Sequence, residues 1–142
     1  MRSKLVNTNP KTYVIVFDPN DEVVKGIEAF CKETDLKAAS FTAIGAFSSA
    51  SLGFFDLSTK EYNKIPIEEQ VEVLSLMGDI IPYQDKPKLH AHAVVGKADG
   101  SAHGGHLLSA IVNPTLEVVV TELPVYLHRE MNEQFGIPLI KL

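Results

Sequence analysis

Histidines with strand-like spacing are the residues of this chain that could do chemistry. His90 and His92 are separated by one residue, and His106 follows later in the segment Gly104–Leu107. Neutral imidazole is the commonest protein ligand for zinc and similar metals. Residues at i and i+2 of a strand point to the same face, so a third histidine from a glycine-flanked turn could complete a three-nitrogen site. We therefore predict a divalent metal, zinc, held by three histidines with one coordination position open.

Two further histidines and two charged residues complete the set of candidate polar groups. His103 is interpreted as a surface residue of the 99–105 loop, and His128 as an exposed residue. Glu122 and Arg129 are candidates for lining a pocket, although a solvated charge is the simpler interpretation of each. The sequence contains no nucleophile elbow, phosphate-binding loop or dinucleotide-binding fingerprint. It therefore suggests metal ligands without naming a catalytic residue.

The composition is that of an ordinary globular protein with an acidic balance. Of the 142 residues, 45% are hydrophobic and 22% charged, with 13 lysines and arginines against 18 aspartates and glutamates. The net charge of −5 is opposite to the basic balance of most proteins that bind nucleic-acid phosphates. Cys31 is the single cysteine, so no internal disulfide can form. Without an apolar segment of signal-peptide or membrane-span length, we expect a cytoplasmic location.

The pattern of apolar residues predicts a single α+β domain over residues 1–142 with a mainly antiparallel sheet. Asp21–Thr34 has apolar residues at helical spacing and is predicted to be the main helix, with Cys31 buried on its apolar face. Gly104–Gly105 is interpreted as an irregular point, and His106–Val112 as either a short helix or a strand. About seven strands are predicted in all, the clearest at residues 12–17, 39–46, 49–56, 61–67, 71–81, 88–95 and 116–122.

A series of segments in a fixed order carries a resemblance to a known family. The segments are Phe41–Ala46, Val71–Ile80, His90–His92, Asp99–Gly100, Gly104–Leu107, Thr121–Leu123 and Arg129–Leu139. Together they resemble the plant-and-prokaryote-conserved (PPC) domain over essentially the whole chain. The resemblance implies a compact fold with a largely antiparallel sheet and a homotrimeric assembly. In prokaryotic members the corresponding elements look like a metal site, and this implication falls on His90, His92 and His106.

The resemblance also bears on DNA binding. In plants the PPC domain is joined to AT-hooks, short Arg-Gly-Arg-Pro segments that enter the minor groove of A·T-rich DNA. Stand-alone prokaryotic members are often labelled DNA-binding through that relationship. This chain has no Arg-Gly-Arg-Pro segment, and its two arginines are Arg2 and Arg129. The sequence therefore counts against direct DNA binding.

Two hypotheses of different classes remain. The preferred one is a homotrimeric metal-binding module of regulatory or ligand-binding type, whose ligand is a small molecule or a protein. Trimerisation would bury the partly apolar faces of strands such as Val71–Ile81. The alternative is a metal-dependent enzyme, in which the metal activates water or polarises a carbonyl of a small substrate. The absence of an evident general base favours the binding module.

Overall fold

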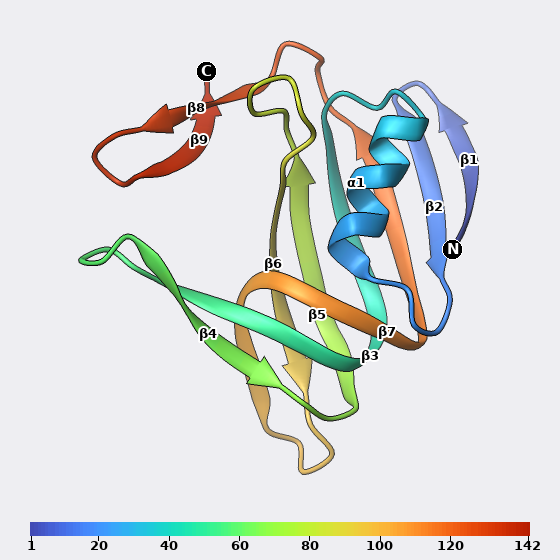
Figure 1. The fold of residues 1–142 in the computed structure, drawn as a ribbon. Helices are drawn as coiled ribbons and strands as arrows, with labels where there is room; N and C mark the ends of the chain where they lie inside the picture. The colour runs from blue at the N-terminus through green and yellow to red at the C-terminus, as the bar shows by residue number, and fades with distance from the viewer.

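The computed structural model describes residues Met1–Leu142, and most of them lie in antiparallel strands (Figure 1). Seven strands form one sheet in the order β1-β2-β7-β6-β5-β3-β4, and β8 and β9 form a separate hairpin. The prediction of one α+β domain with a largely antiparallel sheet is confirmed. The elements are β1 (Arg2–Thr8), β2 (Lys11–Phe17), α1 (Val23–Glu33), β3 (Ala39–Asp56), β4 (Glu61–Ile67), β5 (Val71–Ile80), β6 (Leu89–Gly96), β7 (Ala102–Glu122), β8 (His128–Asn132) and β9 (Ile137–Lys141).

Two long strands bring distant parts of the sheet together. β3 has 18 residues and β7 has 21, and the two pair antiparallel along most of their lengths. β7 also pairs with β6, β6 with β5, and β5 with β3, so these four strands pair in a closed circuit. The first part of β7 thereby pairs with the second half of β6. This pairing brings together histidines that are separated along the chain.

The helix α1 covers one face of the sheet. It begins after Glu22, whose side chain caps the helix by accepting a hydrogen bond from the backbone N–H of Lys25 at 2.7 Å. The side chain of Glu28 accepts a bond from the backbone N–H of Leu89 in β6 at 3.3 Å. These bonds and the apolar stripe fix α1 over β6 and β7 and confirm the predicted helix. Its buried residues are Val23, Ile27, Phe30 and Cys31.

The side chains of strand β6 alternate between the two faces of the sheet. Ala91 and Ala93 are buried in the core beneath α1, whereas His90, His92 and Val94 are exposed on the opposite face. This alternation follows from the two-residue period of a strand. The histidines therefore stand on the face of the sheet that α1 leaves open. No helix in the structure has the length and apolar character that crossing a membrane would require.

The structure corrects the interpretation of Gly104–Gly105 as an irregular point. Both glycines lie within β7, which runs from Ala102 to Glu122. The segment His106–Val112 is therefore a strand and not a short helix. A Cβ atom at Gly105 would come within 2.9 Å of the backbone oxygen of Gly53 in β3. Gly105 is thus needed for the close approach of two strands rather than for a turn.

The remaining differences concern strand boundaries and the two ends of the chain. Residues 39–46 and 49–56, predicted as two strands, form the single strand β3, with the expected irregularities around Gly45. β1 and the β8–β9 hairpin were not among the predicted strands. Their sequences are polar or contain proline, so they lack a clear two-residue period. Because the β8–β9 hairpin lies beside the histidines, its position matters for the candidate site.

Candidate metal centre

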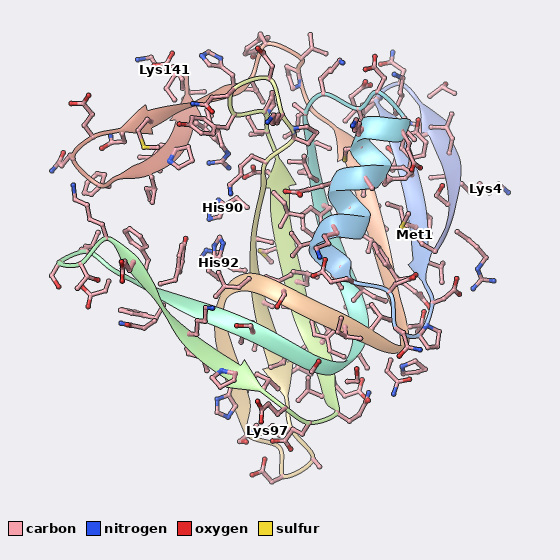
Figure 2. The ribbon with its side chains drawn as sticks, in the orientation of Figure 1. Met1, Lys4, His90, His92, Lys97 and Lys141 are labelled. Atoms are coloured by element: carbon pink, nitrogen blue, oxygen red, sulfur yellow. The ribbon has the colours of Figure 1, made fainter.

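The strand pairings bring the three predicted ligands together. His90 and His92 stand on the same face of β6, and His92 is the direct cross-strand partner of His106 in β7. The ring centroids are 5.2 Å apart for His90 and His92, 5.3 Å for His90 and His106, and 5.6 Å for His92 and His106. Figure 2 shows the labelled His90 and His92 projecting from β6 towards the side on which the β3–β4 and β8–β9 hairpins lie.

The donor atoms of this cluster fit a divalent metal. One ring nitrogen from each of His90, His92 and His106 lies within 4.8 Å of the others. Zinc binds imidazole at ~2.0–2.1 Å and accepts three histidines with a fourth position left open. The Nδ1 atom of His106 is buried and has no hydrogen-bond partner. Buried polar atoms are rarely left unpaired, and this nitrogen is available to a ligand.

Burial holds two of the rings in the form that binds metal. Loss of hydration lowers the pKa of His106 to about 4, and the neighbouring charge of His90 adds to this effect. Partial loss of hydration also lowers the pKa of His90, the positive charge of Arg129 lowers this pKa further, and the negative charge of Asp79 raises it. Both imidazoles are therefore neutral at pH 7. A neutral imidazole keeps the lone pair that a metal ligand needs.

A charged pair lies directly behind His90. The Nη2 atom of Arg129 donates to Oδ1 of Asp79 at 2.6 Å, and Oδ2 of Asp79 is 3.9 Å from Nδ1 of His90. The last distance exceeds a hydrogen bond, so Asp79 acts on His90 through its charge. The negative charge of a nearby carboxylate raises the basicity of a ligating histidine. Asp79 faces His90 across strands β5 and β6, where the two residues are paired.

A small cavity of about 140 Å³ adjoins the histidines. His90 and His106 form one side of it, and Tyr62 of β4 covers His106 with its ring centroid 4.6 Å away. The β8–β9 hairpin forms the opposite side. The cavity provides space for a small molecule beside the histidines. The remaining residues that line it are Lys88, Leu89, Arg129, Ile137, Pro138 and Leu139.

Of the other polar candidates from the sequence, the structure places one beside the histidines and the rest away from them. Arg129 is 6% exposed and lines the cavity, so its interpretation as a solvated charge is wrong. Glu122 is not among the residues that line this cavity, and it pairs with Lys11 at 3.5 Å. His103 lies outside the histidine cluster, and His128 is exposed at the start of β8. Of the two charged candidates, Arg129 alone belongs beside the histidines.

Sequence reasoning missed three residues near the histidines. Asp79 is a carboxylate in a largely apolar strand, and that contrast was the available signal for it. Tyr62 and Lys88 carry no comparable signal, because a tyrosine or a lysine in a segment of mixed polarity is ordinary. Asp79 and Tyr62 come near the histidines through strand pairing and the cavity wall, whereas Lys88 lies two residues before His90. The contacts of Asp79 and Tyr62 depend on the fold rather than on local sequence.

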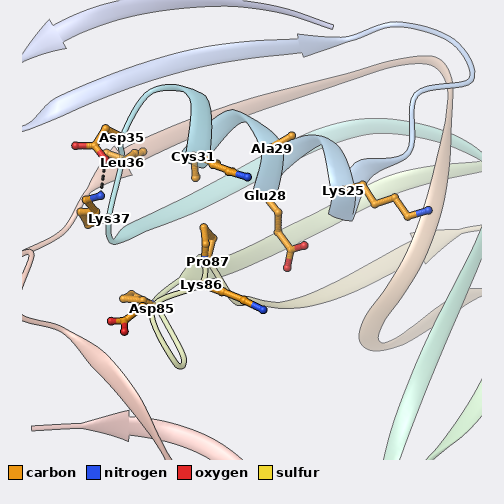
Figure 3. A pocket seen from close by; sticks show the side chains of 12 residues that line it. Lys25, Glu28, Ala29, Cys31, Asp35, Leu36, Lys37, Asp85, Lys86 and Pro87 are labelled. Carbon is orange, nitrogen blue, oxygen red and sulfur yellow. Dashed lines mark ion pairs between the residues drawn. The ribbon is translucent and has the colours of Figure 1, made fainter.

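A larger cavity lies elsewhere and offers less chemistry. It measures about 570 Å³ and lies between α1 and the loop that joins β5 to β6 (Figure 3). Its lining mixes lysines with carboxylates, including the ion pair of Lys37 with Asp35. Cys31 reaches this cavity, but burial raises the pKa of its thiol to about 12, so it stays protonated. The expected burial of Cys31 is confirmed, and we place the candidate site at the histidines.

Known structures resemble this chain over nearly its whole length. A Bacteroides thetaiotaomicron protein, described as a candidate DNA-binding protein, is 34% identical with a TM-score of 0.91 over 98% of this chain and 96% of its own. A metal-containing protein from Archaeoglobus fulgidus is 36% identical with a TM-score of 0.85 over 97% and 95%. A PPC protein from Pyrococcus horikoshii is 27% identical with a TM-score of 0.88 over 99% and 95%.

The family assignment rests on sequence as well as on fold. No curated protein matches this chain. The model of the Plants and Prokaryotes Conserved (PCC) domain, however, matches residues 6–124, which include every strand of the main sheet except the start of β1. The same range contains all three clustered histidines. This chain is therefore a member of the Plants and Prokaryotes Conserved domain family.

Proposed function

We propose that this protein is a metal-binding module in which His90, His92 and His106 hold one divalent cation. The observation that carries the proposal is the convergence of three imidazole nitrogens within 4.8 Å of one another. Zinc is the proposed metal, because an all-nitrogen set of three histidines is typical of zinc sites with an open position. The relative from Archaeoglobus fulgidus, which is a metal-containing protein, adds support.

The site favours binding over catalysis. Its cavity is lined by histidines, cations and apolar side chains but by no carboxylate that could serve as a general base. Asp79 is the carboxylate that lies beside the cluster, 3.9 Å from His90, and it is already paired with Arg129. A ligand-binding or regulatory module therefore fits best. The alternative is a metal-dependent enzyme for a small substrate, and the open metal position beside a cavity is the feature that favours it.

We further propose that the protein is a homotrimer that associates through the open face of the sheet. We define the open face as five apolar side chains that stand opposite α1. They are between 40% and 63% exposed, and large exposed apolar patches mark interaction surfaces. Their strands are neighbours in the sheet, and four of the five side chains line one hollow of its surface. The members of the open face are Ile44, Leu74, Met77, Val94 and Val119.

Direct DNA binding is not part of the proposal. The Bacteroides thetaiotaomicron relative is described as a candidate DNA-binding protein, but this chain has a net charge of −5. Contacts to phosphates supply most of the affinity of DNA-binding proteins. We expect negligible binding to duplex DNA at about 150 mM salt, and submicromolar affinity would contradict this expectation. The cytoplasmic location stays a prediction from the sequence.

Elemental analysis of the purified protein tests the proposed metal site. The untagged protein, prepared without chelator, should contain close to one zinc per chain, and the double variant H90A/H92A should contain none. His103→Ala is the matched control, because His103 lies in the same strand as His106 but outside the cluster. Full metal retention in the double variant, or equal loss in the control, would overturn the assignment.

A further inference from the structure

We propose that the cavity beside the three histidines binds a small organic carboxylate with a short apolar group. This inference deepens the proposed function and rests on it, because the carboxylate would lie next to the metal. It identifies the ligand by its chemistry, from the charge, the walls and the size of the cavity. The residues that carry it are Lys88, Arg129 and the apolar side chains of the β8–β9 hairpin.

The charge of the lining selects an anion. Lys88 and Arg129 both line the cavity, and no carboxylate does. Arg129 is paired with Asp79, but Lys88 has no ion-pair partner within 4.0 Å, so one positive charge is left uncompensated. The buried Nε of Arg129 also lacks an acceptor. An anion would meet a free lysine, an arginine with unused donors and the proposed metal.

The walls of the cavity select an anion that is partly apolar. Leu89 lies on one side, and Ile137, Pro138 and Leu139 of the β8–β9 hairpin lie on the other. A fully polar anion such as inorganic phosphate would lose hydration against these side chains without gaining a partner. An aliphatic group would instead be removed from water by them. The charged and apolar parts of the lining together fit a molecule with a carboxylate at one end.

The size of the cavity limits the ligand to a few carbon atoms. Its volume of about 140 Å³ is well below the ~300 Å³ at which sites for drug-sized molecules begin. Carboxylate oxygen is also an accepted zinc ligand, so the acid group could occupy the open position left by three histidines. Nucleotides and sugars are too large for the cavity to enclose. Short-chain carboxylates such as isobutyrate remain suitable probes.

Calorimetric titration with isobutyrate and with isobutyramide tests the proposal. The two molecules have nearly the same shape, but only isobutyrate carries a charge. We expect isobutyrate to bind the zinc-loaded protein at least about tenfold more tightly than isobutyramide, because charge-assisted hydrogen bonds are the stronger ones. Inorganic phosphate is titrated in parallel and should bind more weakly than isobutyrate. Equal binding of the amide, or tighter binding of phosphate, would overturn the proposal.

Variants of exposed residues locate the binding without disturbing the fold. Lys88→Gln should weaken isobutyrate binding about tenfold, and Lys86→Gln, two residues away and outside this cavity, should leave it unchanged. Leu139→Asp should weaken isobutyrate binding more than Lys88→Gln does, because it places a negative charge in the apolar wall of the cavity. Arg129 is left intact because it also holds the hairpin. Unchanged affinity in both Lys88→Gln and Leu139→Asp would place the anion elsewhere and contradict the proposal.

The metal content of each sample separates this proposal from the one on which it rests. If the protein binds no zinc, the proposed metal site fails, and isobutyrate can still be titrated against the metal-free cavity. If it binds one zinc per chain but shows no preference for isobutyrate over isobutyramide, the carboxylate site fails alone. We expect the metal-free protein to keep the preference for the anion, with lower affinity, because Lys88 and Arg129 remain in place.

Discussion

At the scale of single residues, the site depends on a chain of charges behind one metal ligand. Arg129 is buried and fixes Asp79, and the free oxygen of Asp79 faces His90. Arg129 holds Asp79 by a hydrogen bond, so the negative charge beside His90 depends on an arginine from a separate hairpin. This arrangement makes Asp79 an electrostatic neighbour of His90 rather than a ligand. It also explains why a buried arginine is tolerated on this face of the sheet.

Asp79→Asn should lower zinc affinity by about 10- to 100-fold, since loss of an outer carboxylate typically has that effect. The asparagine keeps the shape of the side chain but removes the charge near Nδ1 of His90. Competition against a chelator of known affinity measures the change. Asp99→Asn, which alters an exposed carboxylate in a turn, is the control. Equal affinities in the two variants would exclude a role for Asp79.

The lowered pKa of His106 predicts how the metal-free protein responds to acid. The pKa is about 4 in the folded protein against 6.5 for an ordinary histidine, so the unfolded chain binds the proton more readily. Stability is therefore unaffected above about pH 6.5 and falls as the pH drops from 6.5 to 4. His106→Gln should reduce this loss in urea unfolding at pH 7 and pH 4.5. An unchanged pH profile in the variant would contradict the buried, neutral state of His106.

The thiol of Cys31 should be inert in the native protein. Its side chain is 1% exposed, and burial raises its pKa to about 12. A thiolate-specific reagent should therefore react slowly under native conditions and label one thiol per chain in denaturant. Rapid labelling of the native protein would show that α1 opens readily from the sheet.

At the scale of secondary structure, close strand contacts around the site depend on glycine. A Cβ atom at Gly78 would lie 2.2 Å from the backbone oxygen of His90, whereas one at Gly104 would be no closer than 3.4 Å to any neighbour. Gly78→Ala should therefore destabilise the protein by at least ~2 kcal/mol, and Gly104→Ala by less than ~1 kcal/mol. Urea unfolding measures both. Equal losses would mean that β5 and β6 do not approach as closely as described.

The same elements show what could be predicted from sequence. The period of β6 predicted that His90 and His92 share a face, because alternation is a local property of a strand. The pairing of His106 with His92 depends on the fold. In the sequence, the two glycines before His106 were only an indirect indication that it lies near the other histidines. Gly105 was misread because glycine signals both a flexible turn and a close backbone approach. The burial of Arg129 depends on its hydrogen bond to Asp79, which lies 50 residues earlier in the chain. A contact between residues so far apart could not be predicted from the sequence.

At the scale of the whole molecule, the sheet has two different faces. One is covered by α1 and forms a core of 28 buried residues. The other carries the histidine cluster and, beside it, the apolar residues of the open face. Met77 belongs to the open face and pairs directly with His92 across strands β5 and β6. Association through this face would therefore bring a second subunit close to the proposed metal.

The proposed assembly predicts the effect of one charge on the open face. The native protein should have three times the chain mass of 15.6 kDa by light scattering. Leu74→Glu should dissociate it, because a carboxylate at a side chain that is 57% exposed in the monomer would be buried without a partner. Val125→Glu, at an exposed position outside the open face, should leave the mass unchanged. A monomeric native protein would refute the trimer.

The most direct test of the central claim is a zinc-edge anomalous difference map from crystals of the zinc-loaded protein. Our account predicts one strong peak per chain, ~2.0–2.1 Å from a ring nitrogen of each of His90, His92 and His106. A fourth position should be open towards the cavity beneath the β8–β9 hairpin. A map with no peak among these histidines, or with its main peak at His128 or at surface carboxylates, would contradict the proposed metal centre.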